Sequence, residues 1–312
     1  MSIRVQKPGL STTVQDCGRF GFAHLGISPC GAADAVSLRI ANRLVGNEEY
    51  APALEMTLLG ATLQFLSDAE IALSGADCGC TLDKDGIAMY SPLRVSANSV
   101  LQCGSTLNGA RTYLAIAGGI NVPLIMGSAS TDVRGKFGGI EGRRLKAGDV
   151  LEVGTAAHGP FRSIPSRILD ELSRTGPIRV TRGAQADWFS KEQFNQFLAS
   201  TYKISEQSDR AGLRLNGESI NPVEPGQLLT DGIPLGAIQV PPDGQPILLF
   251  VDQQTTGGYP KIANAIAADV HRIGQLRPHD EIRFTEVSVS EAIDALRAQE
   301  RWLKDAGRSE DE

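Results

Sequence analysis

The sequence predicts a mainly β protein, a β-rich α+β fold with two domains and a few peripheral helices. Short apolar runs recur between residues 54 and 153 with Gly, Asp and Asn between them, a spacing typical of a sandwich or barrel. The chain contains 34 Gly and 16 Pro, which favour turns. Its 312 residues exceed the usual size of one domain, so we expect two separate cores.

The first half of the chain is predicted to contain one helix among the strands. This helix covers residues 33–45, where apolar residues recur at helical spacing and Gly46-Asn47 follows as a C-terminal stop. Its apolar face consists of Val36, Ile40 and Leu44. Before it, polar residues between glycines form a loop that we expect to be functional: Gln15, Asp16 and Arg19.

The domain boundary is predicted between residues 156 and 176, where the strand pattern gives way to Pro and polar residues. The first domain therefore covers residues 1–155 and the second covers residues 177–287. The second domain contains a helix that starts after Ser190. A terminal helix with an acidic tail occupies residues 288–312, and we expect this helix to have a packing role.

The stretch from residue 236 to 273 carries the strongest local signal of a site. Residues 247–251 are an apolar run that predicts a buried strand, and a helix is predicted to begin at Pro260. Backbone N–H groups at a glycine turn and a helix N-terminus attract anions. We therefore expect an anion site between the two elements; the alternative is a tight turn that merely joins them. Its residues are Thr255, Thr256, Gly257, Gly258 and Lys261.

Charged residues in other glycine-rich loops are further candidates. Arg can bind a carboxylate or phosphate through two parallel hydrogen bonds, and Asp can bind magnesium or guide a proton. Each of these residues can equally form a structural ion pair. The candidates are Asp16 with Arg19, Asp34, Asp132 with Arg134, Asp209 with Arg210, and Asp252 with Lys261.

Several standard catalytic motifs are absent from the sequence. There is no P-loop, no GxGxxG dinucleotide fingerprint and no GxSxG nucleophile elbow. There is also no Met-Lys-Met segment to carry covalent biotin, so a role in biotin chemistry requires a partner that brings the prosthetic group.

Composition narrows the possible partners and the compartment. A formal net charge of -6 without a basic helix face disfavours nucleic acid and anionic membrane surfaces. No apolar run approaches the ~20 residues needed to span a bilayer, and we expect a cytoplasmic protein. Five cysteines at irregular spacing fit a reducing compartment. Cys78-Gly79-Cys80 suggests a metal site, but no second pair stands at the required spacing, so we interpret these as small buried thiols and predict no metal ligands.

Several motifs together resemble one protein family over nearly the whole chain. They are GLSTTVQDCGRFGFAHLGISPCGAADAVSLRIANRLVGN, APALEMTLLG, YLAIAGGINVP with GSASTD, SDRAGLRLNG, and GAIQVPPDGQPILLFVDQQTTGGYPKIA. The family is KipA, also called allophanate hydrolase subunit 2 or the biotin-dependent carboxyltransferase family. The resemblance implies two cyclophilin-like β-barrel domains, consistent with the turn-rich two-domain prediction.

The resemblance also implies an activity and partners. Its best-defined bacterial members are C subunits of ATP-dependent 5-oxoprolinase, which opens 5-oxo-L-proline to L-glutamate with a KipI-like B subunit and a LamB/YcsF-like A subunit. ATP, with magnesium, is then the cofactor of the complex. On this hypothesis the anion site above binds phosphate, Asp252 assists magnesium binding or proton transfer, and Arg19 or Arg210 binds the substrate carboxylate.

Two other functions are compatible with the same resemblance. One is carboxyl transfer to urea or a related amide, with a biotinylated partner. The other is a non-catalytic KipA-type regulator that binds a KipI-like protein.

Overall fold

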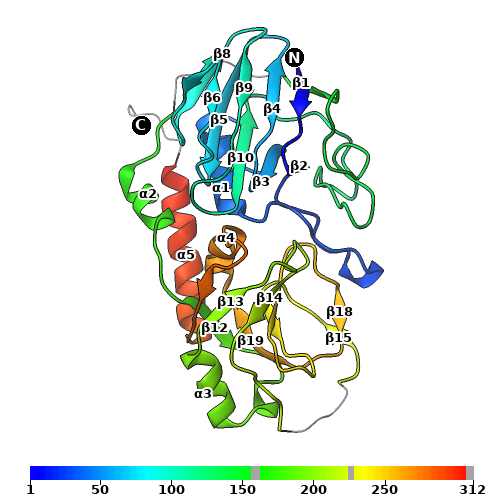
Figure 1. The fold of residues 1–312 in the computed structure, drawn as a ribbon, viewed down its shortest axis with the longest axis vertical. Helices are drawn as coiled ribbons and strands as arrows, with labels where there is room; N and C mark the ends of the chain where they lie inside the picture. Colours follow the sequence, from blue (N-terminus) through cyan, green and yellow to red (C-terminus); the bar gives the residue numbers. More distant parts are fainter. Residues whose placement is uncertain (156–161, 224–227, 307–312) are drawn as a thin grey trace. The chain divides into compact units, whose positions relative to one another are not determined.

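The computed structural model describes residues 1–155, 162–223 and 228–306, and it is mainly β, as predicted (Figure 1). The described chain divides into two compact units. The first unit contains Met1–Arg19, Cys30–Ser173 and the C-terminal residues from Arg301 onward, and the second contains Phe20–Pro29 and Arg174–Glu300.

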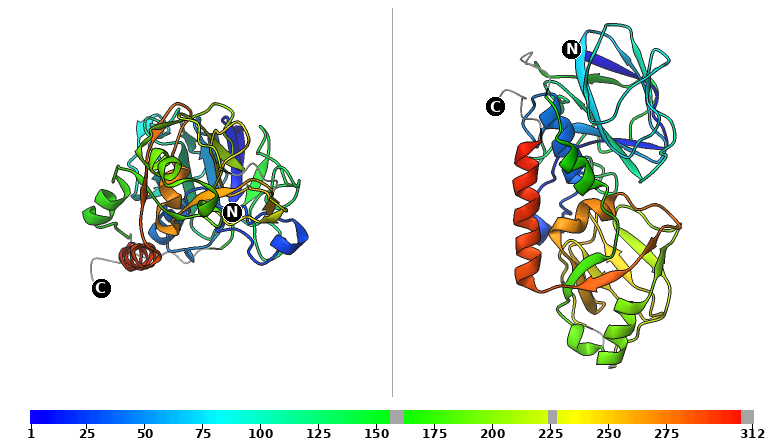
Figure 2. Two further views of the ribbon diagram at one scale, coloured as in Figure 1. Left: turned by 90° about the horizontal axis from the view of Figure 1, so that it is seen from below. Right: turned by 90° about the vertical axis from the view of Figure 1, so that its left-hand side faces the viewer.

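Two antiparallel sheets form the first unit, and their strands curve around its interior in the right-hand view of Figure 2. The six-stranded sheet has the order β11-β1-β4-β9-β6-β7. Its strands are β1 (Ser2–Lys7), β4 (Thr62–Phe65), β6 (Thr81–Leu82), β7 (Asp85–Gly86), β9 (Val100–Gln102) and β11 (Val150–Glu152). The five-stranded sheet has the order β2-β3-β10-β5-β8. Its strands are β2 (Ser11–Gln15), β3 (Ala53–Thr57), β5 (Ala69–Gly75), β8 (Pro92–Val95) and β10 (Arg111–Ile116).

The main core of the first unit lies between these sheets. Leu63 and Phe65 of β4 meet Leu54 of β3 and Leu114 of β10 in one buried apolar cluster. β10 is buried along its whole length, because a second cluster on its other face includes Tyr113. The sheet therefore has an apolar layer on both faces.

Three helices supply this second layer. α1 (Ala35–Leu44) confirms the helix predicted over residues 33–45, and Asp34 Oδ1 accepts a hydrogen bond of 2.8 Å from Ser37 N as its N-cap. α2 (Ser166–Leu172) adds Ile168 to the cluster. α5 (Val289–Asp305) is the predicted terminal helix, and Leu303 near its end and the following Ala306 are both buried in this first-unit cluster.

The second unit is organised around an eight-stranded sheet with the order β20-β13-β14-β17-β16-β19-β12-β21. Its strands are β12 (Ile178–Arg182), β13 (Tyr202–Ile204), β14 (Gly212–Asn216), β16 (Ala237–Gln239), β17 (Ile247–Leu249), β19 (Lys261–Ala265), β20 (Glu281–Ile282) and β21 (Phe284–Glu286). β12 and β21 pair in parallel, and every other pair in this sheet is antiparallel. β15 (Asp231–Gly232) and β18 (Thr256–Gly257) form a separate two-stranded sheet.

Short helices complete the second unit. α3 (Lys191–Ala199) starts where predicted, and Ser190 Oγ accepts a hydrogen bond of 3.2 Å from Gln193 N as its N-cap. Phe197 of this helix stacks on Phe284 of β21 at 4.8 Å between ring centroids. The other helices are η1 (Ala23–Leu25), η2 (Ala186–Trp188), η3 (Ala267–Asp269) and α4 (Val270–Gly274). Within the described ranges, no helix is both long and apolar enough to cross a membrane.

Candidate functional site

The predicted buried strand before the candidate anion site is confirmed as β17, which pairs with β14 and β16. The polar residues that follow it lead into β18, where Gly257 lies opposite Asp231 of β15. Neither Gly257 nor Gly258 has a positive φ angle, so the segment is an extended strand rather than a glycine turn. Gly257 is nevertheless closely packed, because an added Cβ would lie 2.6 Å from Ile233 Cδ1 and would require that side chain to move.

The prediction of a helix that begins at Pro260 is wrong over the first part of that helix. Residues 261–265 form strand β19, which pairs with β12 and β16, and the helical turns begin only at η3 and α4. Both faces of this strand are buried, with Ile262 and Ala263 at 0% exposure, so the alternation that marks a half-exposed strand is missing. No helix N-terminus therefore faces Thr255 and Thr256, and helix-dipole stabilisation of an anion does not apply at this position.

Lys261 provides the positive charge of this segment. Its side chain is 3% exposed, and Nζ lies 3.4 Å from Oδ2 of Asp231, whose side chain is 57% exposed. Thr256 is exposed, Thr255 and Gly258 are half-buried, and Gly257 is buried. An anion that replaced the exposed Asp231 carboxylate would meet the lysine ammonium at the same position.

Arg210 and Asp252, which the sequence offered as two separate site residues, form one ion pair. Nε of Arg210 lies 2.8 Å from Asp252 Oδ2, and Nη2 lies 3.0 Å from Oδ1, so the pair is bidentate. The backbone N–H of Asp252 also donates to Arg210 O at 2.9 Å. These contacts match the alternative considered above, a structural ion pair. The pair joins the end of β17 to the loop before β14.

Asp16 organises the polar loop of the first unit. Its carboxylate accepts hydrogen bonds from Gly18 N at 2.7 Å, Ser128 Oγ at 2.7 Å and Ala129 N at 2.6 Å. Ser130 Oγ donates to it as well. The QDCGR loop and the GSASTD segment, which are more than 100 residues apart in the sequence, are thereby held together.

Arg19 lies in the same loop, and one end of its guanidinium has no partner. The residue is 2% exposed; Nη2 donates to the carbonyl oxygen of Ser130, and Cζ lies 4.8 Å from the centroid of the Phe137 ring. Nη1 is buried and has no hydrogen-bond partner among the described residues. A buried cation without a carboxylate beside it is costly, so this position is the better of the two candidate arginines for binding an anion.

The remaining charged candidates have turn-forming roles. Asp34 caps α1, and Asp132 Oδ1 accepts a hydrogen bond of 2.6 Å from Gly135 N. Asp209 Oδ1 accepts hydrogen bonds from Ala211 N at 2.8 Å and Gly212 N at 3.2 Å. Such bonds from a carboxylate to nearby backbone N–H groups are common in tight turns.

Comparison with known proteins gives the family. Residues 25–286 match the family described as carboxyltransferase domain, subdomain A and B. The chain belongs to this carboxyltransferase domain family. It is 41% identical to the C subunit of 5-oxoprolinase from Escherichia coli, over 97% of this chain and 96% of that protein. It is 34% identical to urea amidolyase of Saccharomyces cerevisiae, over 97% of this chain but only 18% of the yeast protein.

A solved structure supports the fold of this carboxyltransferase-family chain. The crystal structure of the K. lactis urea amidolyase matches with a TM-score of 0.93 and 33% sequence identity. The match covers 99% of this chain and 20% of that one, so this chain corresponds to one part of a much longer protein.

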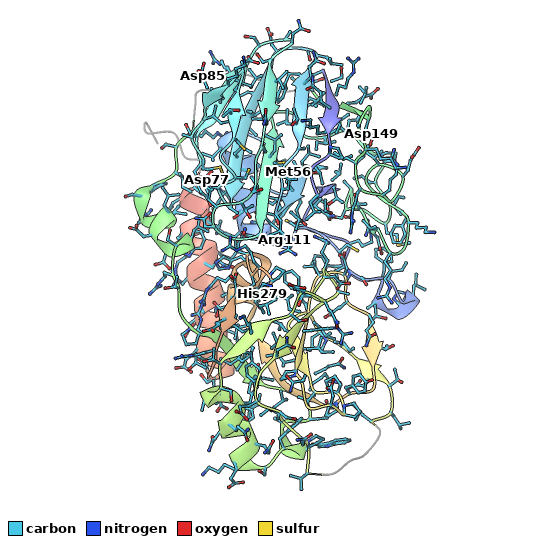
Figure 3. All side chains as sticks on the ribbon, viewed as in Figure 1. Met56, Asp77, Asp85, Arg111, Asp149 and His279 are labelled. Atoms are coloured by element: carbon cyan, nitrogen blue, oxygen red, sulfur yellow. The ribbon has the colours of Figure 1, made fainter. Side chains whose placement is uncertain are left out.

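Two histidines and one cysteine cluster of this carboxyltransferase-family chain lie outside the predicted sites. His279, labelled in Figure 3, has Nε2 2.9 Å from Glu206 Oε1, and His271 Nδ1 lies 3.2 Å from Gln299 Nε2. Within the described part of the chain, one group of side chains is arranged to hold a metal ion: Cys78, Cys80 and Cys103. The sequence spacing concealed this group, because Cys103 follows β9, whereas Cys78 and Cys80 precede β6.

Proposed function

We propose that the chain is the C subunit of an ATP-dependent 5-oxoprolinase, which opens 5-oxo-L-proline to L-glutamate while ATP is hydrolysed. The observation that carries this proposal is the end-to-end correspondence with two proteins that bear the name of the 5-oxoprolinase C subunit, at 41% and 39% identity over 96% of each. Because the alignment covers nearly the full length of each of these subunits, we expect this chain to act as the same subunit. The proposed partners are a KipI-like B subunit and a LamB/YcsF-like A subunit.

The chemistry explains why ATP is required. A lactam carbonyl carbon is a poor electrophile, because the ring nitrogen donates electrons into it. Transfer of the γ-phosphoryl group to the carbonyl oxygen removes this protection. Water then adds to the carbon, and the C–N bond breaks with protonation of the nitrogen, which leaves the phosphoryl group on the new carboxyl group. A second water hydrolyses this acyl phosphate, so the products are glutamate, ADP and phosphate. This route needs cationic donors for the phosphoryl group and an anchor for the substrate carboxylate.

Residues of this chain fit both needs. Arg19 is the proposed carboxylate anchor, because its Nη1 has no partner among the described residues and its Nη2 is fixed by Ser130. Nη1 has no solvent contact, so the loop has to open for the substrate to reach it. Lys261 is the proposed phosphate ligand, with Thr255, Thr256 and the backbone at Gly257 and Gly258 nearby in sequence. Magnesium would enter with ATP.

The experiment reconstitutes the complex with both partners and measures 5-oxoproline-dependent ATP hydrolysis. Replacing a charged hydrogen-bond donor costs about 1.5–3 kcal/mol, so Arg19→Lys should raise the KM for 5-oxoproline by roughly 10- to 100-fold. Lys261→Ala should abolish ATP-coupled ring opening. Lys203→Ala is the control, because Lys203 is exposed on β13.

The possible outcomes separate the function from the site. A wild-type complex that never couples 5-oxoproline to ATP hydrolysis contradicts the function itself. A wild-type complex that is active, with Arg19→Lys and Lys261→Ala equally active, keeps the function and removes these two residues from the site.

Carboxyl transfer is a second candidate function, because urea amidolyase and urea carboxylase contain a domain of the same family. In that case a biotinylated partner would deliver the carboxyl group to urea or a related amide. Loss of carboxyl groups from carboxylated biotin, dependent on both this chain and urea, would favour this candidate. Glutamate formation from 5-oxoproline would exclude it as the main activity.

A further inference from the structure

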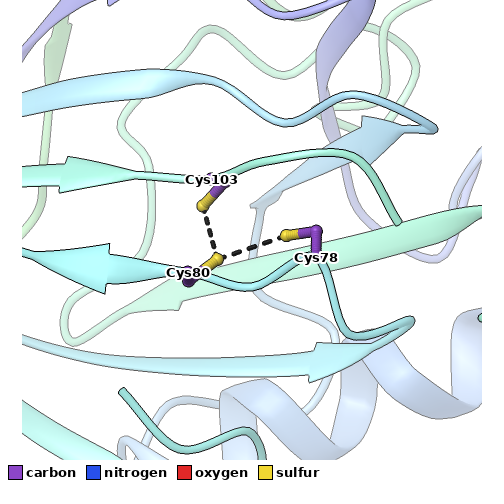
Figure 4. Close-up of side chains that lie close together, drawn as sticks. All are labelled: Cys78, Cys80 and Cys103. Carbon is purple, nitrogen blue, oxygen red and sulfur yellow. Dashed lines mark hydrogen bonds between the residues drawn. The ribbon is translucent and has the colours of Figure 1, made fainter. Parts of the chain in front are cut away.

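Strand pairing brings together two cysteines that are 23 positions apart in the sequence. β6 pairs with β9 in antiparallel register, with Leu82 opposite Leu101 and Thr81 opposite Gln102. Extending this register by one residue places Cys80 opposite Cys103. Their Sγ atoms lie 2.7 Å apart, and both side chains are buried in the first-unit core (Figure 4).

A tight turn adds the third cysteine to this pair. Gly79 has a φ of 57°, a left-handed conformation that glycine adopts without strain, and its N–H donates to Asp77 Oδ1 at 2.8 Å. The turn folds Cys78 back, so that its Sγ lies 3.2 Å from that of Cys80. The sulfur atoms of the three cysteines all lie within 4.8 Å of one another.

Two further glycines allow the backbone to approach the cysteines closely. An added Cβ at Gly60 would lie 2.3 Å from Cys103 Cβ, and one at Gly104 would lie 2.9 Å from the carbonyl oxygen of Cys78. Gly104 N also donates to that oxygen at 2.8 Å. The positions of the sulfur atoms therefore follow from backbone contacts as well as from side-chain packing.

We propose that Cys78, Cys80 and Cys103 form a three-thiolate binding site for a soft metal ion, with Zn²⁺ as the favoured ion. Zinc–sulfur bonds of about 2.3 Å in a trigonal arrangement place sulfur atoms about 4.0 Å apart, so the two closer pairs would each move apart by about 1 Å. Soft thiolate ligands select zinc, Cu(I) and related ions over magnesium and calcium.

The low-dielectric surroundings favour a divalent ion over Cu(I). Three thiolates leave one net negative charge around Zn²⁺ but two around Cu(I), and burial makes each uncompensated charge costly. Gly79 is exposed, so the turn that carries Cys78 is the part of the cluster nearest to solvent, and an ion would enter by way of this turn.

The thiols themselves favour one ionised sulfur in the absence of a metal. Hydrogen bonds with Cys103 and then Cys80 lower the pKa of the Cys78 thiol to about 3. Hydrogen bonds with Cys78 and Cys80, together with burial, raise the pKa of Cys103 above its ordinary value.

The test uses the full chain, purified under reducing conditions and titrated with Zn²⁺ and with Cd²⁺ against a chromophoric chelator. We expect one ion per chain, a thiolate-to-cadmium charge-transfer absorption, and three sulfur neighbours by X-ray absorption. Loss of a residue that only hydrogen-bonds to a metal ligand weakens metal binding by up to roughly 100-fold. Cys103→Ser removes a ligand itself, so it should weaken Cd²⁺ binding by at least that factor. Cys17→Ser should leave it unchanged, because Cys17 lies outside the cluster.

A second measurement on the wild-type protein avoids variants that fail to fold. Bound Cd²⁺ should protect Cys78, Cys80 and Cys103 from alkylation, as mapped by peptide mass spectrometry, while Cys17 reacts as before. Absence of bound ion, equal binding by Cys103→Ser, or a disulfide within the cluster in place of metal binding would each overturn the site. Tighter binding of Cu(I) than of Zn²⁺ would overturn the choice of ion.

Discussion

The carboxylate of Asp16 is expected to be the most sensitive single group of the first unit's polar loop. In Asp16→Asn, one oxygen becomes an NH₂ group. If this group takes the place of Oδ2, it faces the N–H of Ala129; if it takes the place of Oδ1, it faces the N–H of Gly18. Either orientation leaves a backbone donor without an acceptor, the buried N–H of Ala129 or the half-buried N–H of Gly18, and removes the charge from the remaining hydrogen bonds.

The cost follows from these contacts. Loss of a charge-assisted hydrogen bond, together with an unsatisfied backbone donor, lowers the free energy of unfolding by about 3 kcal/mol. This lowers Tm by about 6–12 °C for a unit of this size. Differential scanning calorimetry measures the change. Asp209→Asn is the matched control: Asp209 is exposed and uses only Oδ1, which the amide retains, so we expect less than about 0.5 kcal/mol. A Tm for Asp16→Asn within about 2 °C of wild type would refute the reasoning.

Three further perturbations test other parts of the structure. Burial raises the pKa of Asp269, but hydrogen bonds with Arg179 and its charge lower that pKa by more than burial raises it. The pKa of Asp269 is therefore below its ordinary value. The stability contributed by this carboxylate is therefore complete above about pH 4 and is lost as pH falls through the folded pKa; Asp269→Asn should flatten the acid limb of a urea-unfolding pH series. Tyr113→Phe removes the acceptor of the Asp34 N–H at 2.8 Å and should cost about 1–3 kcal/mol in the same urea assay, whereas an unchanged midpoint would contradict that contact. Gly138→Ala places a Cβ 2.0 Å from a backbone oxygen at a φ of 72°, so we expect a large loss of soluble protein or a clearly lower Tm by calorimetry.

Sequence patterns predicted the elements whose ends are marked by Gly, Pro or polar residues. Helix α1 was predictable because its apolar stripe ends at Gly46, and β17 because a short apolar run lies between Pro246 and a polar segment. β19 was not predictable in this way, because side chains on both of its faces are buried and the spacing of Ile262 and Ile266 is compatible with a helix.

The sequence indicated candidate residues but not the contacts that they make. The pairing of Arg210 with Asp252 joins positions 42 apart, and only the fold shows that each charge is used by the other. Likewise, Arg19 Nη2 donates to the carbonyl oxygen of Ser130, which is 111 positions away, and this contact holds the guanidinium where Nη1 has no partner among the described residues. Long-range register determines such contacts, and local periodicity carries no information about it.

The first unit completes its apolar core with residues at and just beyond the last turn of α5. Leu303 and Ala306 lie in a cluster whose other members include Ile40, Tyr113 and Ile168. During translation, this cluster stays open until Leu303 and Ala306 have left the ribosome. The first unit therefore cannot reach its native state co-translationally ahead of the second, and an expression fragment that stops after residue 173 would expose an apolar surface prone to aggregation.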